Sequence, residues 1–363
     1  MISADIHITR PGGFTLDVQL HLGDGVSALY GPSGAGKTSI LRLLAGLERG
    51  TGDDTINIRA DDVEWQGRRG FVPSYQRKIG YVFQRPQLFP HLNVEKNLAY
   101  AIKRVRSDQA PALAQVQEWL DLSELLDKRV DQLSGGEGQR VAIGRALLSG
   151  ARYLLLDEPL GSVDQAARWR ILPYLARLHR ELDVPMIYVS HSLDEVNYLA
   201  DVVYMIESGR VAAAGSVFET SASLEFNKNE SDSLAAVVHC KAVNYDAAFG
   251  LAEFSLGRQS LYVASDGPIT GSGYRVRIPA RDVSITLVKP ENTSILNIMV
   301  ATVDDMEEPV PLTGASVLVR LAVDDQFILA RITRKSLSHL GLRKGLEVYV
   351  QIKGVALLTD NVS

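Results

Sequence analysis

The octapeptide GPSGAGKT at residues 31–38 constrains the fold more than any other stretch of this 363-residue chain. It follows the apolar run VSALY (26–30), precedes the helix-like SILRLLAGL (39–47) and matches the pattern G-x-x-x-x-G-K-[ST]. Glycines let the backbone curl until successive N–H groups face inward, and a helix N-terminus adds a partial positive charge. A flexible glycine turn would require neither Lys-Thr at this offset nor a strand and a helix beside it. The stretch therefore predicts a loop that binds polyphosphate.

Two side chains of this loop have specific expected roles. Lys37 would reach the β- and γ-phosphates of a nucleotide, and Thr38 would supply a hydroxyl group to Mg²⁺. The residues expected to hold the nucleotide are Gly31, Pro32, Ser33, Gly34, Ala35, Gly36, Lys37 and Thr38.

Further apolar runs surround the loop in the first part of the chain, residues 1 to about 222. IGYVF (79–83), YLLLD (153–157) and MIYVS (186–190) are continuously apolar, which is typical of parallel strands covered on both faces. Helical patterns alternate with them, and residues 84–149 read as a mostly helical insert. The pattern predicts an α/β domain.

Two local signals refine the end of this domain. Ser192 can cap a helix while Glu195 reaches back to complete a capping box, so a helix is expected directly after MIYVS. DVVYMIESGRVAAAG (201–215) is expected to form a hairpin that turns at Ser208-Gly209.

Composition limits the classes of partner. A net charge of −5 with 22% charged residues gives no electrostatic footprint for nucleic acid, so no such partner is expected. No segment reaches the roughly 18 to 20 consecutive apolar residues of a membrane-spanning helix, and MISADIHITRPGG lacks the pattern of a signal peptide. The single cysteine, Cys240, excludes an internal disulfide and fits a reducing compartment.

Polar side chains follow the predicted strands where ligands bind in open α/β sheets. Asp157 ends one strand and suits the outer shell of a metal, while Glu158 could polarise an attacking water as a general base. His191 and Gln84 follow two other strands. Taken singly, His191 also fits a structural histidine and Gln84 an exposed polar residue. The loop at 31–38 favours a catalytic interpretation.

A second glycine-rich turn, LSGGE (133–137), is followed by GQRVAIGRALLSG, so it opens a helix and predicts a second anion site. One chain that binds one nucleotide has no obvious need for two. With this motif the sequence resembles the ATP-binding cassette (ABC) family over residues 1 to about 222. The loop at 31–38, Gln84, LSGGE, LLLDEP (154–159), GSVD (161–164) and His191 occur in the family's order.

The resemblance implies an α/β P-loop NTPase with a RecA-like core, a helical subdomain at about 84–149, and hydrolysis of ATP with Mg²⁺. It implies a head-to-tail homodimer in which LSGGE of one subunit covers the nucleotide on the P-loop of the other. Ser134 and Gly136 would contact the γ-phosphate across the dimer, and Asp164 would lie in a loop that crosses the interface. His191 would hold the γ-phosphate and the water. Thr38, Gln84 and Asp157 are the expected Mg²⁺ ligands.

YVFQRPQLFPHLNV (81–94) looks like the segment with which importer ATPases of this family grip their permeases. The region from Gln84 to Val94 is therefore the expected contact with integral membrane permease subunits, although a buried loop would use the same residues. The resemblance implies a peripheral location on the cytoplasmic face of the plasma (inner) membrane. A periplasmic or extracellular binding protein would be an indirect partner.

The composition changes after about residue 222. A polar linker is expected at 223–236, and residues 237–363 read as short strands with glycine turns, an all-β domain related to oligonucleotide/oligosaccharide-binding (OB) barrels. RVRIPARDVSIT (275–286) weakly echoes YVQIKGVALLT (349–359), which suggests two related β units. Any two strands rich in Val and Ile would also look alike.

Residues 290–360, and more weakly those from 237, resemble the oxyanion-binding (Mop/TOBE-like) domain appended to ATPases of molybdate importers. Matching positions for a molybdate or tungstate site are Ser294, Asn297 and Lys353. A tetrahedral dianion needs several preorganised donors and a nearby cation. The alternative is a domain that only stabilises the ATPase dimer.

The predicted function is the ATP-hydrolysing energy-coupling subunit of an ABC importer for molybdate or tungstate, with a C-terminal oxyanion-binding regulatory domain. Importers of sulfate, thiosulfate, iron or polyamines share the ATPase and are the alternatives within this class. A soluble ABC ATPase not coupled to transport would be expected to carry long coiled-coil inserts or tandem cassettes. A molybdate-storage module would have no use for the ATPase.

Overall fold

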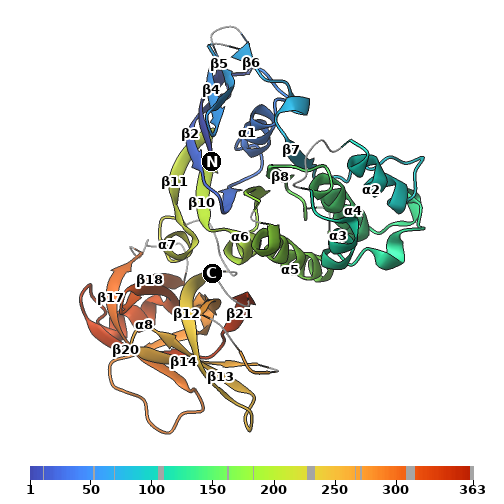
Figure 1. Ribbon diagram of the computed structural model, residues 1–363. Helices are drawn as coiled ribbons and strands as arrows, with labels where there is room; N and C mark the ends of the chain where they lie inside the picture. Colours follow the sequence, from blue (N-terminus) through green and yellow to red (C-terminus); the bar gives the residue numbers. More distant parts are fainter. Residues whose placement is uncertain are drawn as a thin grey trace. The chain divides into compact units, whose positions relative to one another are not determined.

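The computed structural model describes residues 1–10, 12–51, 54–68, 70–104, 110–161, 163–182, 184–226, 234–265, 267–269, 272–307 and 315–359. The chain forms two compact units, Met1–Gly215 and Ser216–Ser363 (Figure 1). The short helix α7 (Val217–Ser221) therefore groups with the second unit, whereas the sequence analysis assigned it to the first domain. Of the expected linker at 223–236, residues 227–233 lie outside the described part of the chain.

The first unit is built on a sheet that has eleven strands within the described residues, in the order β6-β5-β4-β1-β2-β11-β10-β3-β9-β8-β7. The strands are β1 (Ile2–Thr9), β2 (Thr15–Leu22), β3 (Val26–Tyr30), β4 (Thr55–Ala60), β5 (Val63–Gly67), β6 (Gly70–Phe71), β7 (Ile79–Val82), β8 (Tyr153–Asp157), β9 (Met186–Ser190), β10 (Val202–Glu207) and β11 (Arg210–Ser216). Strands β10, β3, β9, β8 and β7 are parallel, as predicted.

Helices cover both faces of the parallel strands. On β8, Tyr153 and Leu155 pack in one buried cluster with α1 (Lys37–Leu44). The alternate residues Leu154 and Leu156 pack in a second cluster with helices α4 (Gly135–Leu147) and α5 (Gln165–Leu182). Every residue of β8 is buried and all but its last, Asp157, are apolar, so the α/β prediction is confirmed.

The antiparallel strands β1, β2 and β4 of this sheet were not predicted from the sequence. Strand β1 pairs with β2 and with β4, and all three alternate between buried and exposed residues. This alternation is the ordinary pattern of a strand with one buried face, and it was present in the sequence.

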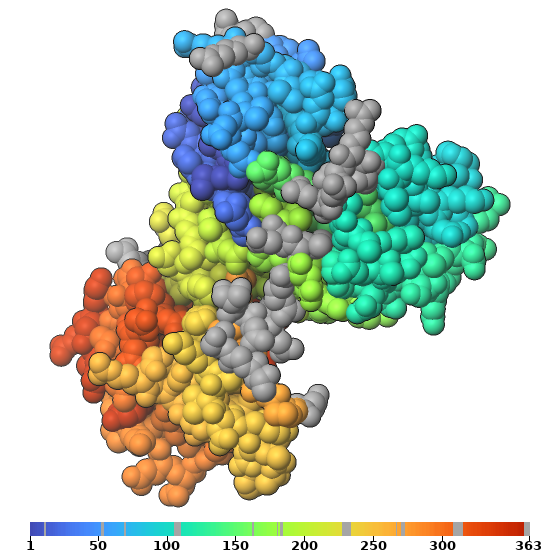
Figure 2. Space-filling view, viewed as in Figure 1, coloured from blue at the N-terminus to red at the C-terminus, as the bar shows by residue number. Residues whose placement is uncertain are grey.

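Between β7 and β8 the chain is helical. It contains α2 (Val94–Ile102), α3 (Leu113–Trp119) and α4, with short 3₁₀ turns at Ser123–Leu125 and Val130–Gln132. These elements share a buried apolar cluster with α5. In the space-filling view they form a lobe, cyan to green, beside the blue N-terminal strands (Figure 2).

The predicted hairpin and helix start are present, but the predicted capping box is wrong. Ser208 and Gly209 join β10 to β11 with positive φ values of 47° and 79°. Helix α6 (Leu193–Leu199) begins directly after Ser192, whose side chain makes no capping hydrogen bond. Glu195 instead turns into the interior, where buried donors offer it stronger partners than an exposed backbone N–H group.

The second unit contains two five-stranded sheets, ordered β14-β13-β12-β15-β21 and β16-β20-β17-β18-β19. The first comprises β12 (Ala235–Asp246), β13 (Leu251–Leu256), β14 (Gln259–Ala264), β15 (Ser272–Pro279) and β21 (Ala356–Thr359). The second comprises β16 (Val283–Thr286), β17 (Asn297–Met306), β18 (Ser316–Val323), β19 (Gln326–Thr333) and β20 (Glu347–Ile352), and helix α8 (Arg334–Leu340) follows β19. The all-β prediction for this region is confirmed.

The weak sequence echo corresponds to a structural repeat. The segment 275–286 passes from β15 in the first sheet to β16 in the second, and 349–359 passes from β20 back to β21. The two segments run antiparallel, with β15 paired to β21 and β16 paired to β20. Each half of the repeat therefore supplies an edge strand to the sheet of the other half.

Two glutamines occupy matching places in this repeat. Gln259 begins β14, and its amide bonds the backbone N and O of Val300 at 2.7 and 2.9 Å. Gln326 begins β19, and its amide bonds the backbone N and O of His239 at 2.7 and 2.8 Å. Each side chain thus takes the place of a strand neighbour across the boundary between the two sheets.

Among the described residues, no helix is both long enough and apolar enough to cross a lipid bilayer.

Candidate nucleotide-binding site

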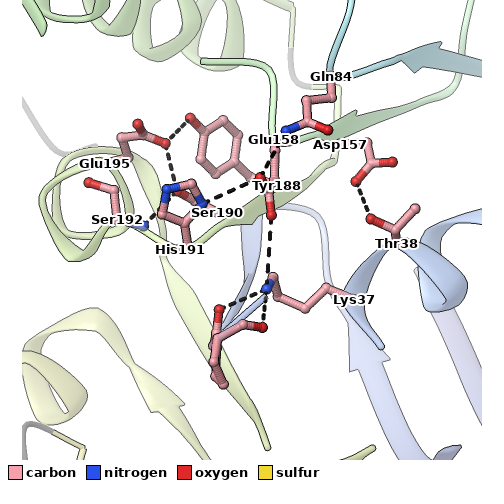
Figure 3. A network of polar contacts seen from close by, with 12 residues as sticks. Lys37, Thr38, Gln84, Asp157, Glu158, Tyr188, Ser190, His191, Ser192 and Glu195 are labelled. Carbon is pink, nitrogen blue, oxygen red and sulfur yellow. Dashed lines mark hydrogen bonds and ion pairs between the residues drawn. The ribbon is translucent and has the colours of Figure 1, made fainter. Parts of the chain in front are cut away.

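Polar side chains from four parallel strands meet beyond the carboxyl ends of those strands. Lys37 follows β3, Gln84 follows β7, Glu158 follows β8 and His191 follows β9 (Figure 3). Parallel strands end at the same edge of a sheet, so residues far apart in sequence are brought together there. Glu158 contacts each of the other three.

The loop between β3 and α1 has a backbone that only glycine can adopt at key points. At Gly31 (φ 150°) an added Cβ would lie 2.1 Å from the carbonyl oxygen of Ile206. Gly36 (φ 106°) is the N-cap of α1 and supplies no capping side chain. The first N–H groups of α1 therefore remain available to an anion, as the sequence predicted.

Lys37 is 4% exposed and folds back over the loop. Its Nζ donates to the carbonyl oxygens of Gly31 and Pro32 at 2.7 and 2.8 Å, and lies 4.0 Å from Oε1 of Glu158. Burial lowers the pKa of this ammonium group, while the Glu158 and Asp157 carboxylates oppose that shift. The arrangement places one buried cation where the loop curls.

Thr38 and Asp157 are directly linked. Thr38 Oγ1 donates to Asp157 Oδ1 at 2.9 Å, and the hydroxyl of Tyr81 donates to Asp157 Oδ2 at 2.9 Å. Asp157 is 7% exposed, and burial raises the pKa of its carboxyl group. Tyr81 was not identified from the sequence, because its contact with Asp157 depends on the pairing of β7 with β8.

Glu158 lies at the centre of the group. Its Oε2 accepts from Gln84 Nε2 at 3.3 Å and lies 3.3 Å from His191 Nδ1. Glu158 has a positive φ of 43°, an uncommon conformation for a non-glycine residue that often marks a functional site. The imidazole of His191 is half exposed, so it faces the space where a ligand would lie.

The LSGGE turn opens α4 as predicted. Ser134 caps the helix by accepting from Glu137 N at 3.3 Å, while Glu137 accepts from Ser134 N at 2.7 Å. Lys128 Nζ lies 2.9 Å from the other carboxylate oxygen of Glu137. The Ser134 backbone N–H and then Lys128 lower the pKa of Glu137 to about 2.

The turn is exposed and lies beside a cavity of about 330 Å³. Ser134, Gly136, Arg140 and Tyr174 are among the residues that line it, and no lining residue belongs to the loop at 31–38. The described chain therefore presents the two predicted anion sites as separate surfaces.

Asp164 directly precedes α5, and its Oδ1 accepts from Ala167 N at 2.9 Å while its carbonyl oxygen accepts from Arg168 N at 2.9 Å. Its side chain is thus held at the helix start. Ser162 of the GSVD motif lies outside the described residues.

The segment from Gln84 to Val94 packs against the helical lobe through a buried amide. Asn97 is fully buried, accepts from Phe89 N at 2.9 Å and donates to the carbonyl oxygen of Asn93 at 3.0 Å. A cavity of about 350 Å³ lies beside this segment. Its lining includes Tyr81, Phe89, Tyr100, Arg104 and Arg145.

The three residues predicted to bind oxyanion lie near one end of β17 and β20. Ser294 is exposed in the loop before β17, and Lys353 is exposed directly after β20, not within a strand. Asn297 pairs with Ile352 and is 6% exposed. Its amide bonds the backbone N and O of Tyr262 at 2.7 and 2.9 Å. Asn297 therefore links β17 to β14, and its role as an anion ligand stays a prediction.

Comparison with known proteins adds to this geometry. Residues 15–161 match the family described as ABC transporter, and residues 293–358 match the TOBE domain. The chain is 45% identical over 359 residues to the Molybdenum import ATP-binding protein ModC of Methylococcus capsulatus, covering 98% of this chain and 99% of that protein. It is 45% identical over 349 residues to the protein of the same name from Thiobacillus denitrificans, covering 95% of each.

Two solved structures share the fold of the first unit. One is cbiO1 from Clostridium perfringens, part of the ABC transporter complex cbiONQ, with a TM-score of 0.52 and 24% identity over 59% of this chain and 88% of that chain. The other is the dimeric ATP-binding cassette MJ0796 bound to ADP and Pi, with a TM-score of 0.50 and 23% identity over 60% of this chain and 98% of that chain. At these identities the likeness shows the fold alone, which is the predicted one.

Proposed function

The chain belongs to the ABC transporter family, and we propose that it is the ATP-hydrolysing, energy-coupling subunit of an importer for molybdate or tungstate. The observation that carries the proposal is the convergence of Lys37, Glu158 and His191 at one edge of the parallel sheet. A buried cation, a carboxylate and an imidazole at this place match the needs of phosphoryl transfer to water.

Each of these side chains has a distinct task. The N–H groups of the loop and of α1 bind the phosphates, and the Lys37 ammonium exchanges its two carbonyl partners for oxygens of the β- and γ-phosphates. Glu158 accepts a proton from the attacking water as general base. His191 holds the γ-phosphate and keeps the Glu158 carboxylate oriented through the 3.3 Å contact.

The residues also fit Mg²⁺. This ion prefers oxygen ligands and usually takes only one or two from the protein, with substrate phosphates and water supplying the rest. The Thr38 hydroxyl and the Asp157 carboxylate are 2.9 Å apart, and the Gln84 amide lies beside Glu158. These three would hold the ion, and when bound it would neutralise charge on the phosphate oxygens.

The active assembly is a head-to-tail homodimer. The Ser134 turn exposes the N-terminus of the 13-residue helix α4, whose free N–H groups suit an anion, and the chain's own phosphate loop does not line the adjoining cavity. A second copy would therefore bring its nucleotide to Ser134 and Gly136. Asp164 would lie in the loop that crosses the interface.

The permease partner docks against the segment from Gln84 to Val94. The adjoining cavity combines aromatic residues, Phe89 and Tyr100, with the cationic Arg104 and Arg145. Asn97 fixes the backbone of the segment, so a force applied there reaches Gln84 through a rigid loop. The chain would accordingly work at the cytoplasmic face of the plasma membrane, in a complex supplied by an extracytoplasmic binding protein.

Molybdate or tungstate is the proposed cargo because the relatives identical at 45% over nearly the whole chain carry molybdenum import in their names. The TOBE match at residues 293–358 covers Ser294 and Lys353, which offer a hydroxyl group and a cation for a regulatory oxyanion. The preorganised donors that such an anion needs would include backbone N–H groups of the same loops.

A chromosomal Glu158→Gln allele in the organism of origin tests the function. We expect it to abolish uptake of radioactive molybdate while sulfate uptake continues. Loss of sulfate, iron or polyamine uptake instead would assign another cargo, and unchanged uptake of every solute would indicate an ATPase outside transport. Calorimetric titration of the full chain with molybdate, tungstate and sulfate tests the regulatory site, which is refuted if none of the three anions releases or absorbs heat.

A further inference from the structure

A buried polar cluster lies behind the candidate site and takes no part in the proposed chemistry. Its centre is the carboxylate of Glu195 on α6, which is 3% exposed. Oε2 of Glu195 accepts from the Tyr188 hydroxyl at 2.8 Å and from the Ser190 hydroxyl at 2.6 Å (Figure 3). Oε1 lies 3.1 Å from Nε of Arg168 on α5.

Such a cluster is costly unless every member is paired. Tyr188 is fully buried and Ser190 is 2% exposed, and both hydroxyl groups donate to Glu195. Burial and the neighbouring Glu195 carboxylate raise the pKa of Tyr188, so its hydroxyl stays a donor. The Glu195 carboxylate thus accepts two hydrogen bonds and forms an ion pair with Arg168, a junction that a neutral side chain could not reproduce.

The Glu195 junction fixes the residues on both sides of His191, Ser190 and Ser192. Ser190 precedes His191 and donates to Glu195, and the same hydroxyl oxygen accepts from the backbone N–H of Ser192 at 3.0 Å. His191 therefore lies between two residues whose positions are fixed by one carboxylate. Its own imidazole is half exposed, and its Nδ1 lies 3.3 Å from Oε2 of Glu158.

The other side of the junction reaches the start of α5. Arg168 donates its backbone N–H to the carbonyl oxygen of Asp164 at 2.9 Å, while its guanidinium group lies against Glu195. Asp164 is the residue expected in the loop that crosses the dimer interface. A single chain of contacts thus runs from His191 through Ser190, Glu195 and Arg168 to Asp164.

We propose that Glu195 is a positioning residue that locks the His191 turn to the Asp164 turn, so that the two move as one unit when the site closes on ATP. The inference rests on the proposed ATPase function of this site. It assigns Glu195 no contact with the nucleotide. Its removal should therefore lower the rate of hydrolysis and leave the binding of ATP nearly unchanged.

The test is a double-mutant cycle on the full chain, with ATP hydrolysis measured well below the Tm of each variant. Glu195→Gln keeps the side-chain volume and is expected to lower kcat about ten-fold while KM for ATP changes less than about two-fold. In a His191→Ala background the same substitution should lower kcat by less than about two-fold, because the residue it positions is gone. A loss due only to reduced stability would be equal in both backgrounds.

Two further variants make the result decisive. Glu181→Gln breaks an exposed pair with Arg177 on α5 and should leave kcat and Tm unchanged. Ser190→Ala removes only the contacts next to His191, so it replaces Glu195→Gln in the cycle if that variant does not fold. Additive effects with His191→Ala, or an unchanged kcat, overturn the proposal.

Failure of the proposed function gives a different result. Glu158→Gln leaves the Glu195 cluster intact, so a Glu158→Gln enzyme that hydrolyses ATP at the normal rate refutes the assignment of the site. Additivity in the cycle, together with an inactive Glu158→Gln variant, refutes only the role of Glu195.

Discussion

Oε2 of Glu158 lies 3.3 Å from Nδ1 of His191, although the two residues follow different strands of the sheet and are 33 positions apart (191 − 158). The contact joins the residue expected to accept the proton of the attacking water to the residue expected to hold the γ-phosphate. It predicts that the two act together and that removal of either one lowers the rate of hydrolysis.

Glu158→Gln is therefore expected to lower kcat by about 10² to 10⁴-fold, the usual contribution of a general base. Binding of ATP should persist, because Lys37 and the phosphate loop are unchanged. Phosphate release and size-exclusion chromatography with Mg·ATP measure the two effects, and we expect a nucleotide-bound dimer to accumulate. A variant with normal turnover would remove Glu158 from the role of base.

Asp157→Asn should stabilise the nucleotide-free protein and inactivate it. Burial raises the pKa of Asp157 above its usual 3.8, so the folded protein holds this proton more tightly than the unfolded chain. The free energy of unfolding therefore falls as the pH rises from about 3.8 through the folded-state pKa. At pH 7.5 the variant should melt at a higher temperature than the wild type.

The same linkage supplies the control. Below about pH 3.8 the wild-type carboxyl group is protonated in both states, so the difference in Tm between wild type and Asp157→Asn should vanish. Hydrolysis should fall by at least about 10²-fold at every pH. A variant that is less stable than the wild type at pH 7.5 would contradict the account.

Gly31→Ala and Gly34→Ala form a matched pair in the phosphate loop. Both glycines have positive φ, but an added Cβ meets the carbonyl oxygen of Ile206 at 2.1 Å at Gly31 and open space at Gly34. We expect the free energy of unfolding to fall by about 1 kcal/mol for Gly34→Ala and by about 3 kcal/mol or more for Gly31→Ala. Urea denaturation measures both losses of stability. Equal losses would show that the positive φ alone, and not the contact with Ile206, determines the cost of an added Cβ.

Glu137→Gln should weaken the start of α4 in a pH-dependent way. The Ser134 N–H group and Lys128 lower the pKa of Glu137 from 4.5 to about 2, so its contribution is fully present above pH 4.5 and is lost as the pH falls toward 2. At pH 7 the substitution is expected to lower the free energy of unfolding by about 1 kcal/mol. Melting curves between pH 7 and pH 2.5 should show that the difference in Tm between wild type and Glu137→Gln becomes smaller as the pH falls. A difference that grows in acid would refute the stabilising role of the Glu137 carboxylate.

Gln259→Ala and Gln326→Ala test the repeat in the second unit. Each amide makes two hydrogen bonds to one backbone residue of the other half, but the Gln326 pair is partly buried and the Gln259 pair is exposed. We expect the free energy of unfolding to fall by about 2 kcal/mol for Gln326→Ala and by about 1 kcal/mol for Gln259→Ala. The double variant, followed by circular dichroism in denaturant, should show additive losses, since the two contacts are separate.

Much of the candidate site could be predicted because it follows from short-range patterns. Continuous apolar runs identify β8 and β9 as parallel strands, and the residues that follow them, Glu158 and His191, must then lie at the same edge of the sheet. The start of a helix at the LSGGE turn was equally local. In each case the signal lies within a few residues.

The unpredicted features depend on contacts between distant segments. Glu195 fitted the pattern of a capping residue, but Arg168 and Tyr188 supply better partners, and their proximity arises only when α5, α6 and β9 pack. The contact of the Asn297 amide with the backbone of Tyr262 on another sheet was likewise not predicted, and the role of Asn297 as an anion ligand stays a prediction. A side chain's spacing in the sequence cannot reveal which remote donor it will meet.

The exchange of edge strands in the second unit affects the order in which its strands can pair during synthesis of the chain. Strand β15 gains its partner β21 only at residues 356–359, well after β15 itself has been synthesised. The β15 edge of this sheet therefore stays open after Pro279 while residues 280–355 are synthesised. Until then that edge is exposed to other nascent chains, and a stop codon before residue 356 would leave it permanently unpaired.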